Sequence, residues 1–448
     1  MSTNPIFEKI EGEPDLAPAG TGKVILTLIQ QTVVLLLISP FTLLFGILYF
    51  LIRIVARRPP TIPNPKTVFY YIKRSLFWQT AHNEIVFSMR LRLLLSMFSF
   101  LAFCPMFALA WYIDDVFFPG YRTTPIVRPL FIITGSRSGS TQLSQYLEEN
   151  PQVVSHPLLL QIFPYIWLWK LAPKLLGRFF PEEKLVEVMK KTVPAGFLER
   201  KEFHPLKPET FEIIFSGSQL VNHSMAMGAE MFAEGYGWGR TTPNNAEFWE
   251  KDLVDVIEQF GKKMIYAGGS KPDGSAKTLV IKGHFLGSAD SLERRFPDAH
   301  FLTILRHPSN RIRSIMNFFR VAPEVCVNGG IPWPWLVHYG RTVEVNYSLY
   351  EKEWYQARSE NTTIIRFRDY VDDLETTLRI IYERCLPDVD WEGYIPSEHA
   401  PRKRSGYSVN RTYEQLNIDE EEFLAPLAEY IEWVNEPCPY TLKAEDGD

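Results

Sequence analysis

The chain has 448 residues, and 47 Lys and Arg against 52 Asp and Glu give it a formal net charge of −5. Hydrophobic residues make up 46% of the chain, enough for a sizeable core, and the length exceeds that of one usual domain. The acidic balance, with no sustained basic stripe, argues against a nucleic-acid partner. The 4 cysteines are too few and too scattered for a disulfide framework or a zinc site.

Two long apolar segments precede the rest of the chain. Residues 24–52 carry no charge over 29 residues, and residues 93–113 carry none over 21. Both exceed the roughly 18 residues that mark a membrane-spanning helix. We therefore expect two transmembrane helices, the first tilted or bent near Pro40. Pro105 and the acidic pair after residue 113 leave a buried or interfacial hairpin as the alternative for the second segment.

The charges around these segments predict an orientation. The linker 53–92 holds eight Lys or Arg and one acid, whereas the tail 1–23 holds two Lys and four acids. By the positive-inside rule the linker is cytoplasmic, which places the tail and the region after residue 113 in the secretory lumen, in the Golgi or a neighbouring compartment. Glycosylation sequons that fit this lumen begin at Asn222, Asn346, Asn361 and Asn410.

The next segment has the pattern of an anion-binding loop. Residues 130–134 predict an apolar strand, residues 135–141 read Gly-Ser-Arg-Ser-Gly-Ser-Thr, and a polar helix opens at Gln142. Gly135 and Gly139 allow a tight turn whose N–H groups point at an anion, while the hydroxyls and Arg137 add donors. The loop lacks the Lys that a nucleotide-triphosphatase loop carries before its last hydroxyl. An ordinary strand-turn-helix corner is the alternative.

A second strand, predicted at residues 278–281, ends in Lys282 and, two residues later, His284. A neutral imidazole is a suitable general base at physiological pH, so His284 is a candidate to deprotonate a hydroxyl. A structural histidine is the alternative. Glu209 and Glu212 are the fallback bases, although lone acids in such mixed segments are more often solvated surface groups.

A third motif consists of a predicted strand at 301–305, a turn at Pro308 and a helix. Arg306 at the strand end and Ser314 on the helix can both donate to one phosphate, each charge-assisted bond contributing about 1.5 to 3 kcal/mol. Because Arg311 and Arg313 also lie there, a basic surface helix is the alternative.

The strands at 130–134, 278–281, 301–305 and 362–367 are short, rich in Ile, Leu, Val and Thr, and separated by segments with helical periodicity, such as 248–260 and 374–385. This pattern predicts an α/β fold with a three-layer parallel sheet, helices on both faces, and the two transmembrane helices in front of it. Both phosphate motifs fall at the carboxyl ends of strands, where such sheets bind ligands.

The three motifs together resemble those of the sulfotransferases that use 3'-phosphoadenosine-5'-phosphosulfate (PAPS). That family writes its loop Pro-Lys/Arg-Ser-Gly-Thr/Ser-Thr, and residues 137–141 match it, with Ser136 in place of Pro. Cytosolic members carry Lys-x-His at the second strand end, at the interval before the 3'-phosphate Arg that separates His284 from Arg306. The resemblance implies a P-loop-like sulfotransferase domain over residues 125–440.

The resemblance also implies roles for single residues. His284 would be the base, with Arg137 and Lys282 stabilising charge, although several membrane-bound members use a Glu instead. The implied PAPS-binding residues are Ser136, Arg137, Ser138, Gly139, Ser140, Thr141, Arg306, Ser314, Arg402 and Lys403. The last two lie in a late basic segment that could equally be a solvated loop. The Trp that stacks on adenine in cytosolic members is Gln142 here.

We therefore expect a membrane-anchored sulfotransferase that moves a sulfuryl group from PAPS to an acceptor hydroxyl of a glycan, lipid, sterol or protein, without a metal. A nucleotide-dependent phosphotransferase would need a magnesium-binding hydroxyl and acid pair, which we do not find. A membrane scaffold that keeps the fold without turnover is the non-enzyme alternative. The aromatic stretches 163–169 and 331–335 could line an acceptor pocket, lie at a membrane interface or pack in the core.

Overall fold

The computed structural model describes residues 21–60, 62–77, 87–175, 181–192, 204, 206–211, 246–320, 333–395 and 410–440. At its centre is a 5-stranded sheet in the order β2-β3-β1-β4-β5, in which every pairing is parallel. The strands are β1 (Leu130–Ile133), β2 (Val153–Val154), β3 (Thr278–Gly283), β4 (His300–Leu305) and β5 (Thr362–Arg366).

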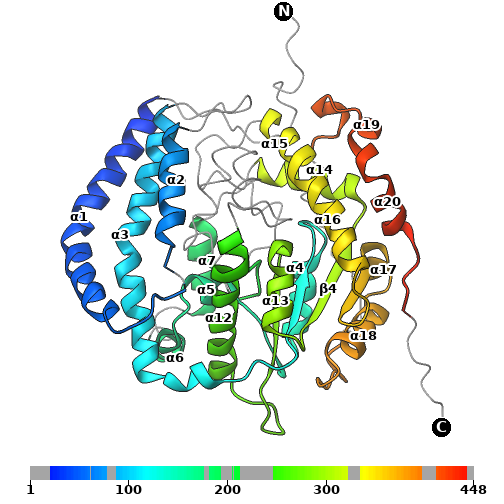
Figure 1. Cartoon of the computed structure of the whole chain (residues 1–448), viewed down its shortest axis with the longest axis horizontal. Helices are drawn as coiled ribbons and strands as arrows, with labels where there is room; N and C mark the ends of the chain where they lie inside the picture. The colour runs from blue at the N-terminus through cyan, green and yellow to red at the C-terminus, as the bar shows by residue number, and fades with distance from the viewer. Residues whose placement is uncertain are drawn as a thin grey trace, which may run out of the picture.

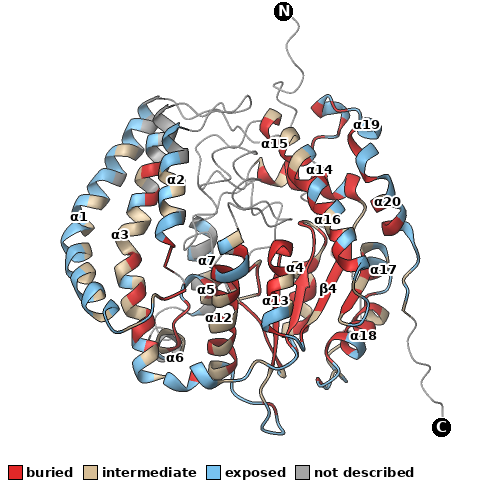
Figure 2. Ribbon diagram, viewed as in Figure 1, coloured by how far each residue is buried: buried red, intermediate tan, exposed pale blue. Residues whose placement is uncertain are grey.

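Successive residues of the central strands pack on opposite faces of the sheet, as the period of two of a strand requires. Leu130 and Ile132 join one core, with helices α4 (Ser140–Glu148) and α18 (Leu374–Cys385). Phe131 and Ile133 join the other. That second core contains α12 (Leu253–Gly268), α13 (Ala289–Arg295), α14 (Pro308–Phe319) and α16 (Val345–Gln356). Figure 2 shows the buried sheet between its helices, which confirms the predicted three-layer α/β fold.

Most predicted elements appear where the sequence places them. The helix expected at 248–260 begins as a π-helical turn, η3 (Phe248–Asp252), and continues as α12. The edge strand β2 was not predicted, because two valines carry no periodicity. The other helices are α5 (Leu158–Ile162), α6 (Ile166–Leu175), α7 (Glu182–Thr192), α15 (Trp333–Tyr339), α17 (Phe367–Asp372), α19 (Glu420–Leu424) and α20 (Ala428–Asn435), with short turns η2 (Pro119–Thr123), η4 (Leu286–Ser288), η6 (Gly340–Glu344), η8 (Glu414–Leu416) and η9 (Ala425–Leu427).

Both apolar N-terminal segments are helical, as α1 (Thr21–Arg53) and α3 (Phe87–Phe117), with the short α2 (Pro65–Phe77) between them in the chain. Figure 1 shows α1 and α3 side by side at one end of the molecule. Among the described residues, Leu28–Arg53 and Met97–Phe117 are long and apolar enough to cross a membrane, by length and composition only.

The two helices run in the same direction. Thr42 Oγ1 donates to the carbonyl of Ala102 at 3.0 Å. Tyr49 and Tyr112, which come later in both helices, stack with ring centroids 6.4 Å apart. Two crossings joined by a linker on one side of a bilayer would run antiparallel. The parallel packing therefore departs from the expected topology, in which residues 53–92 form a cytoplasmic linker.

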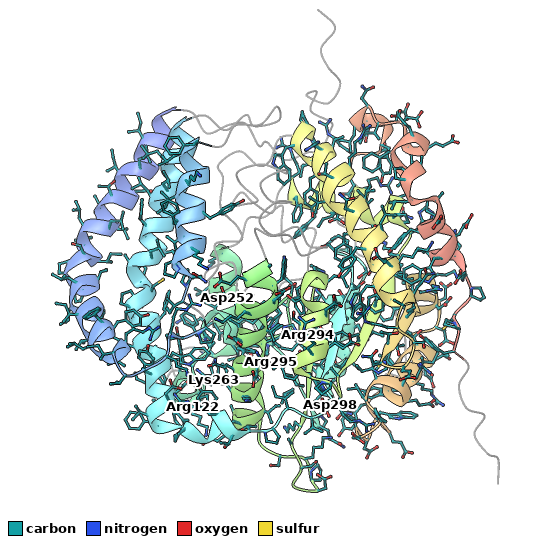
Figure 3. All side chains as sticks on the ribbon, in the orientation of Figure 1. Arg122, Asp252, Lys263, Arg294, Arg295 and Asp298 are labelled. Carbon is teal, nitrogen blue, oxygen red and sulfur yellow. The ribbon has the colours of Figure 1, made fainter. Side chains whose placement is uncertain are left out.

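Helix α3 is attached to the sheet domain near both of its ends. Leu94 and Met97 belong to the same core as the residues of α12. Near the other end, Asp114 forms an ion pair with Lys263 of α12 at 2.7 Å, with neither side chain exposed, and Figure 3 labels Lys263 on that helix. The Asp114 carboxylate also accepts from the N–H groups of Ile166 and Trp167 at the start of α6. Helix α3 is thus one continuous, partly buried helix and not the hairpin considered as the alternative for the second apolar segment.

Candidate active site

The carboxyl ends of the three central strands lie next to each other. Ile133 of β1 pairs in register with Gly283 of β3, and Leu130 pairs with His300 of β4 on the other side. The residues that follow these strands therefore meet at one edge of the sheet. There the Thr134 side chain donates to the carbonyl of Ile304 at 2.9 Å, which ties the loop after β1 to the end of β4.

The loop after β1 has the backbone that an anion-binding turn needs. Arg137 and Gly139 both adopt positive φ, 67° and 91°, and α4 begins directly afterwards at Ser140. Ser138 is fully buried, and its hydroxyl forms a hydrogen bond with Thr134 Oγ1 at 3.1 Å. The first N–H groups of a helix have no carbonyl partner inside it, so the start of α4 supplies donors at the end of the loop.

The first and third sequence motifs converge here. Arg137 Nε donates to Ser314 Oγ of α14 at 3.2 Å, and Arg306 Nη1 donates to the carbonyl of Arg137 at 2.5 Å. Each guanidinium also lies over an aromatic ring, Arg137 over Phe318 at 4.9 Å and Arg306 over Phe367 at 4.5 Å. Two guanidinium groups and a serine hydroxyl are thus gathered within one small region, next to the N-terminus of α4.

The second motif reaches the same edge. His284 Nδ1 lies 2.7 Å from the carbonyl of Thr134, and because a carbonyl only accepts, Nδ1 carries a proton. The Lys282 N–H donates to Nε2 of the buried His156 at 2.7 Å. Burial first, and the Lys282 charge second, lower the pKa of His156 to about 3, so this histidine is a neutral acceptor that holds the end of β3.

One fallback base lies beside this strand end. The Phe211 N–H donates to the carbonyl of Lys282 at 2.9 Å, which brings the segment before it against β3. Glu209 in that segment is 5% exposed, so its expected place among solvated surface acids is wrong. Tertiary pairing with β3, invisible in the local sequence, buries it. Glu212 lies outside the described residues.

A family model described as the sulfotransferase family matches residues 129–393, more than half of the chain. The chain belongs to the sulfotransferase family. No curated protein matches the chain significantly.

Among solved structures, the enzyme is similar to sulfotransferase STF9 from Mycobacterium avium, with 16% identity, a TM-score of 0.54, and 83% of this chain and 92% of that chain covered. It is also similar to sulfotransferase STF1 from Mycobacterium tuberculosis H37Rv, with 14% identity, a TM-score of 0.52, and 82% and 93% covered. At such identities the likeness shows the fold alone.

A buried ionic network, which sequence reasoning missed, supports the loop of this sulfotransferase. Glu351 of α16 accepts from the Gly135 N–H, and Arg311 of α14 pairs with Glu344. Arg311 is 1% exposed, so the alternative of a basic surface helix is wrong at this position. A Cβ on Gly135 would lie 2.5 Å from Arg311 Nη1, which explains the glycine. Its sequence signal was weak, since Glu351 is one of two acids within a mixed helix and nothing in the local pattern sets it apart.

Several sequence predictions concern other parts of the sulfotransferase. Arg402 and Lys403 lie outside the described residues. Trp333 and Trp335 are buried in the core, which agrees with the core-packing alternative for that stretch, whereas the stretch 163–169 is mixed, with Tyr165 buried and Phe163 40% exposed. Among the described residues no group of three or more His, Cys, Asp or Glu could hold a metal ion.

Proposed function

We propose that this sulfotransferase transfers a sulfuryl group from PAPS to an acceptor hydroxyl. The observation that carries the proposal is the contact of Arg137 with Ser314 and of Arg306 with Arg137, which joins two motifs far apart in the chain. PAPS carries anionic groups at both its 5' and 3' positions, and the site provides a glycine-rich loop next to a pair of guanidinium groups. Charge-assisted bonds of this kind are the strong ones.

The loop residues and the third motif divide the binding of the donor between them. We assign the 5'-phosphosulfate to the residues Ser136, Arg137, Ser138, Gly139, Ser140 and Thr141, and the 3'-phosphate to Arg306 and Ser314, with Arg402 and Lys403 in the late basic segment. When bound, PAPS supplies an activated sulfuryl group. Arg137 and the loop amides stabilise the charge that builds during transfer, and Lys282 contributes to the same field.

His284 is the proposed base. Its Nδ1–H donates to the Thr134 carbonyl, so Nε2 carries the lone pair and the ring is held in one orientation. Nε2 would take the proton of the acceptor hydroxyl. Glu209 is the second candidate, because it is buried two residues before Phe211, whose N–H donates to Lys282.

Calorimetry with 3'-phosphoadenosine 5'-phosphate and with adenosine 5'-phosphate tests the donor assignment. The first nucleotide should bind far more tightly, and Arg306→Ala should weaken it by about 10- to 150-fold, corresponding to about 1.5 to 3 kcal/mol. Arg313→Ala, on the same helix and bonded to Asn310 at the surface, is the matched control. Equal affinity for the two nucleotides would remove the basis of the proposal.

Transfer of radiolabelled sulfate to cell extracts, resolved into glycan, lipid, sterol and protein fractions, identifies the acceptor class. The same assay separates the alternatives. Phosphate transfer from a nucleoside triphosphate would indicate the phosphotransferase. Donor binding without transfer to any fraction would indicate the scaffold.

For the compartment we propose the secretory lumen, with membrane attachment through the N-terminal helices. The sequons support it, and Asn346 is exposed on α16. Because α1 and α3 pack in parallel, a tag inserted near Pro63 should lie on the same side of the membrane as the sheet domain. A glycosidase-sensitive protein with a protected tag would agree with the proposal, whereas an unglycosylated, protease-accessible domain would contradict it.

A further inference from the structure

Helix α1 is apolar on all sides, yet within the described part of the chain only one of these sides is covered by protein. Its half-buried side chains recur at intervals of three, four or seven: Leu28, Leu35, Ile38, Thr42, Phe45, Tyr49 and Ile52. This stripe packs on α3. The large apolar side chains that are described on the other sides of the helix are each 41–68% exposed: Ile25, Leu26, Ile29, Val33, Val34, Leu36, Leu37, Phe41, Leu43, Leu44, Ile47, Leu48, Phe50 and Leu51. We call these residues the outer face of α1.

The packing of α3 fixes how α1 can meet a membrane. Helix α3 is held on the sheet domain near both ends, by Leu94 and Met97 and by the ion pair of Asp114 with Lys263. Beyond α1, Arg58 pairs with Asp252 at the start of α12. If α1 crossed a bilayer, the side-by-side α3 and the charged surface of α12 would be carried into the hydrocarbon, where charged groups are costly.

The length of α1 also argues against a membrane crossing. The helix has 33 residues, which at about 1.5 Å per residue is roughly 50 Å, well beyond the approximately 30 Å of the hydrocarbon layer. A helix lying in the plane of the membrane has no such limit.

We propose that the outer face of α1 lies in one leaflet of a lipid bilayer, with the helix axis along the membrane plane, so that the enzyme is attached to the membrane without crossing it. The two ends of α1 and the sheet domain are then all on the same side. The proposal does not depend on the identity of the sulfuryl donor.

A fluid lipid phase fits this face better than a second copy of the chain. A helix packed against α1 would cover a stripe about as narrow as the one that α3 covers, whereas the outer face takes up most of the circumference. Lipid chains surround such a face completely. The exposed Arg53 and Arg57 follow the apolar run and suit the phosphate groups of lipid headgroups at its edge.

Flotation of the full-length protein with vesicles of phosphatidylcholine and phosphatidylserine tests the partner. Leu37→Glu with Leu44→Glu, both on the outer face, should lower the partition coefficient of the protein between vesicles and solution at least tenfold. The matched control, Leu349→Glu with Val371→Glu, places two charges at exposed apolar positions of α16 and α17 and should bind like the parent. Equal far-UV circular dichroism of the three proteins shows that they are folded.

Vesicle binding of the outer-face variant equal to that of the parent would overturn the proposal. The proposal would also fail if the parent did not bind vesicles and sedimented as a dimer that the outer-face variant disrupts. The outer face of α1 would then bind a second copy of the chain.

Labelling in sealed membranes from expressing cells tests the orientation. Gly22→Cys and Val55→Cys place exposed thiols at the two ends of α1, and a membrane-impermeant maleimide is added before and after detergent. Above the background of the parent chain, an in-plane helix has both thiols reacting alike before detergent. One reactive and one protected thiol would show a crossing. Arg306→Ala should leave both membrane assays unchanged, so failure of the donor assignment is seen separately.

Discussion

The Glu351 carboxylate accepts a hydrogen bond from the Gly135 N–H at 3.3 Å, at the first glycine of the anion-binding loop. The same side chain accepts from the hydroxyl of Thr303 on β4 and from that of Tyr430 on α20, both at 2.7 Å. Burial raises the pKa of Glu351 above its ordinary range. One buried carboxyl thus ties the loop after β1 to elements more than 150 residues away.

Replacing this carboxyl should loosen the loop. Glu351→Ala leaves three buried donors without their acceptor, at a cost of about 1 to 3 kcal/mol for each donor left unsatisfied. We expect a lower free energy of unfolding in urea and at least tenfold weaker binding of 3'-phosphoadenosine 5'-phosphate. Glu351→Gln keeps an acceptor oxygen and should recover most of the affinity. Glu353→Ala, an exposed acid on the same helix, is the control. Unchanged nucleotide affinity in Glu351→Ala would show that the loop does not need this support.

The buried pair of Lys263 and Asp114 should hold α3 on the sheet domain. Lys263→Met leaves the buried Asp114 carboxylate without its cation, and breaking such a pair costs about 3 to 5 kcal/mol. Asp114→Leu in addition should restore only part of the stability, because the N–H groups of Ile166 and Trp167 then lose their acceptor. Urea denaturation measures the free energy of unfolding of the single and the double variant.

The control for this pair is the neighbouring Lys262, which is part-exposed and bonded to Glu258. Lys262→Met should cost under about 1 kcal/mol, as surface ion pairs do. If Lys263→Met and Lys262→Met lowered the free energy of unfolding equally, the buried pair would stabilise the fold no more than a surface ion pair does.

The sequence predicts well what depends on local pattern and poorly what depends on distant packing. Strand ends carry the motif residues Arg137, His284 and Arg306, and parallel strands bring their carboxyl ends together, so the convergence of these residues could be predicted. Glu351 could not, since an acid in a mixed helix looks solvated until β4 and α20 cover it. The direction of α1 was equally hidden. Apolar composition sets how much of a helix avoids water, not which surface the helix packs on.

The stability of α4 should depend on pH through Glu148. Burial raises the pKa of this carboxyl to about 7, although the positive charge of Lys207 lowers it. The folded state therefore binds the proton more tightly than the unfolded chain, and ionisation opposes folding. The cost is absent at acid pH, grows as the pH rises from about 4.5 to about 7, and reaches up to about 3 kcal/mol above that.

Glu148→Gln removes this cost, so its advantage in thermal unfolding over the parent should grow between pH 5 and about pH 8. Glu149→Gln, at the exposed neighbouring position, should show no such trend. An advantage of Glu148→Gln that stays constant with pH would contradict the assignment of a raised pKa.

The last prediction assigns the base. His284 and Glu209 both lie at the end of β3, and the histidine contacts the loop after β1 through the Thr134 carbonyl. Proton removal matters only in the transition state, so His284→Ala should lower kcat by 100-fold or more while leaving nucleotide affinity intact.

Arg306→Ala should show the opposite balance, with the larger effect on donor binding. Glu209→Gln separates the two candidates, because it keeps the shape of the side chain and removes only its basicity. If His284→Ala keeps nearly full turnover while Glu209→Gln is inactive with unchanged nucleotide affinity, the buried carboxylate takes the proton, and His284 then only joins the end of β3 to the anion-binding loop.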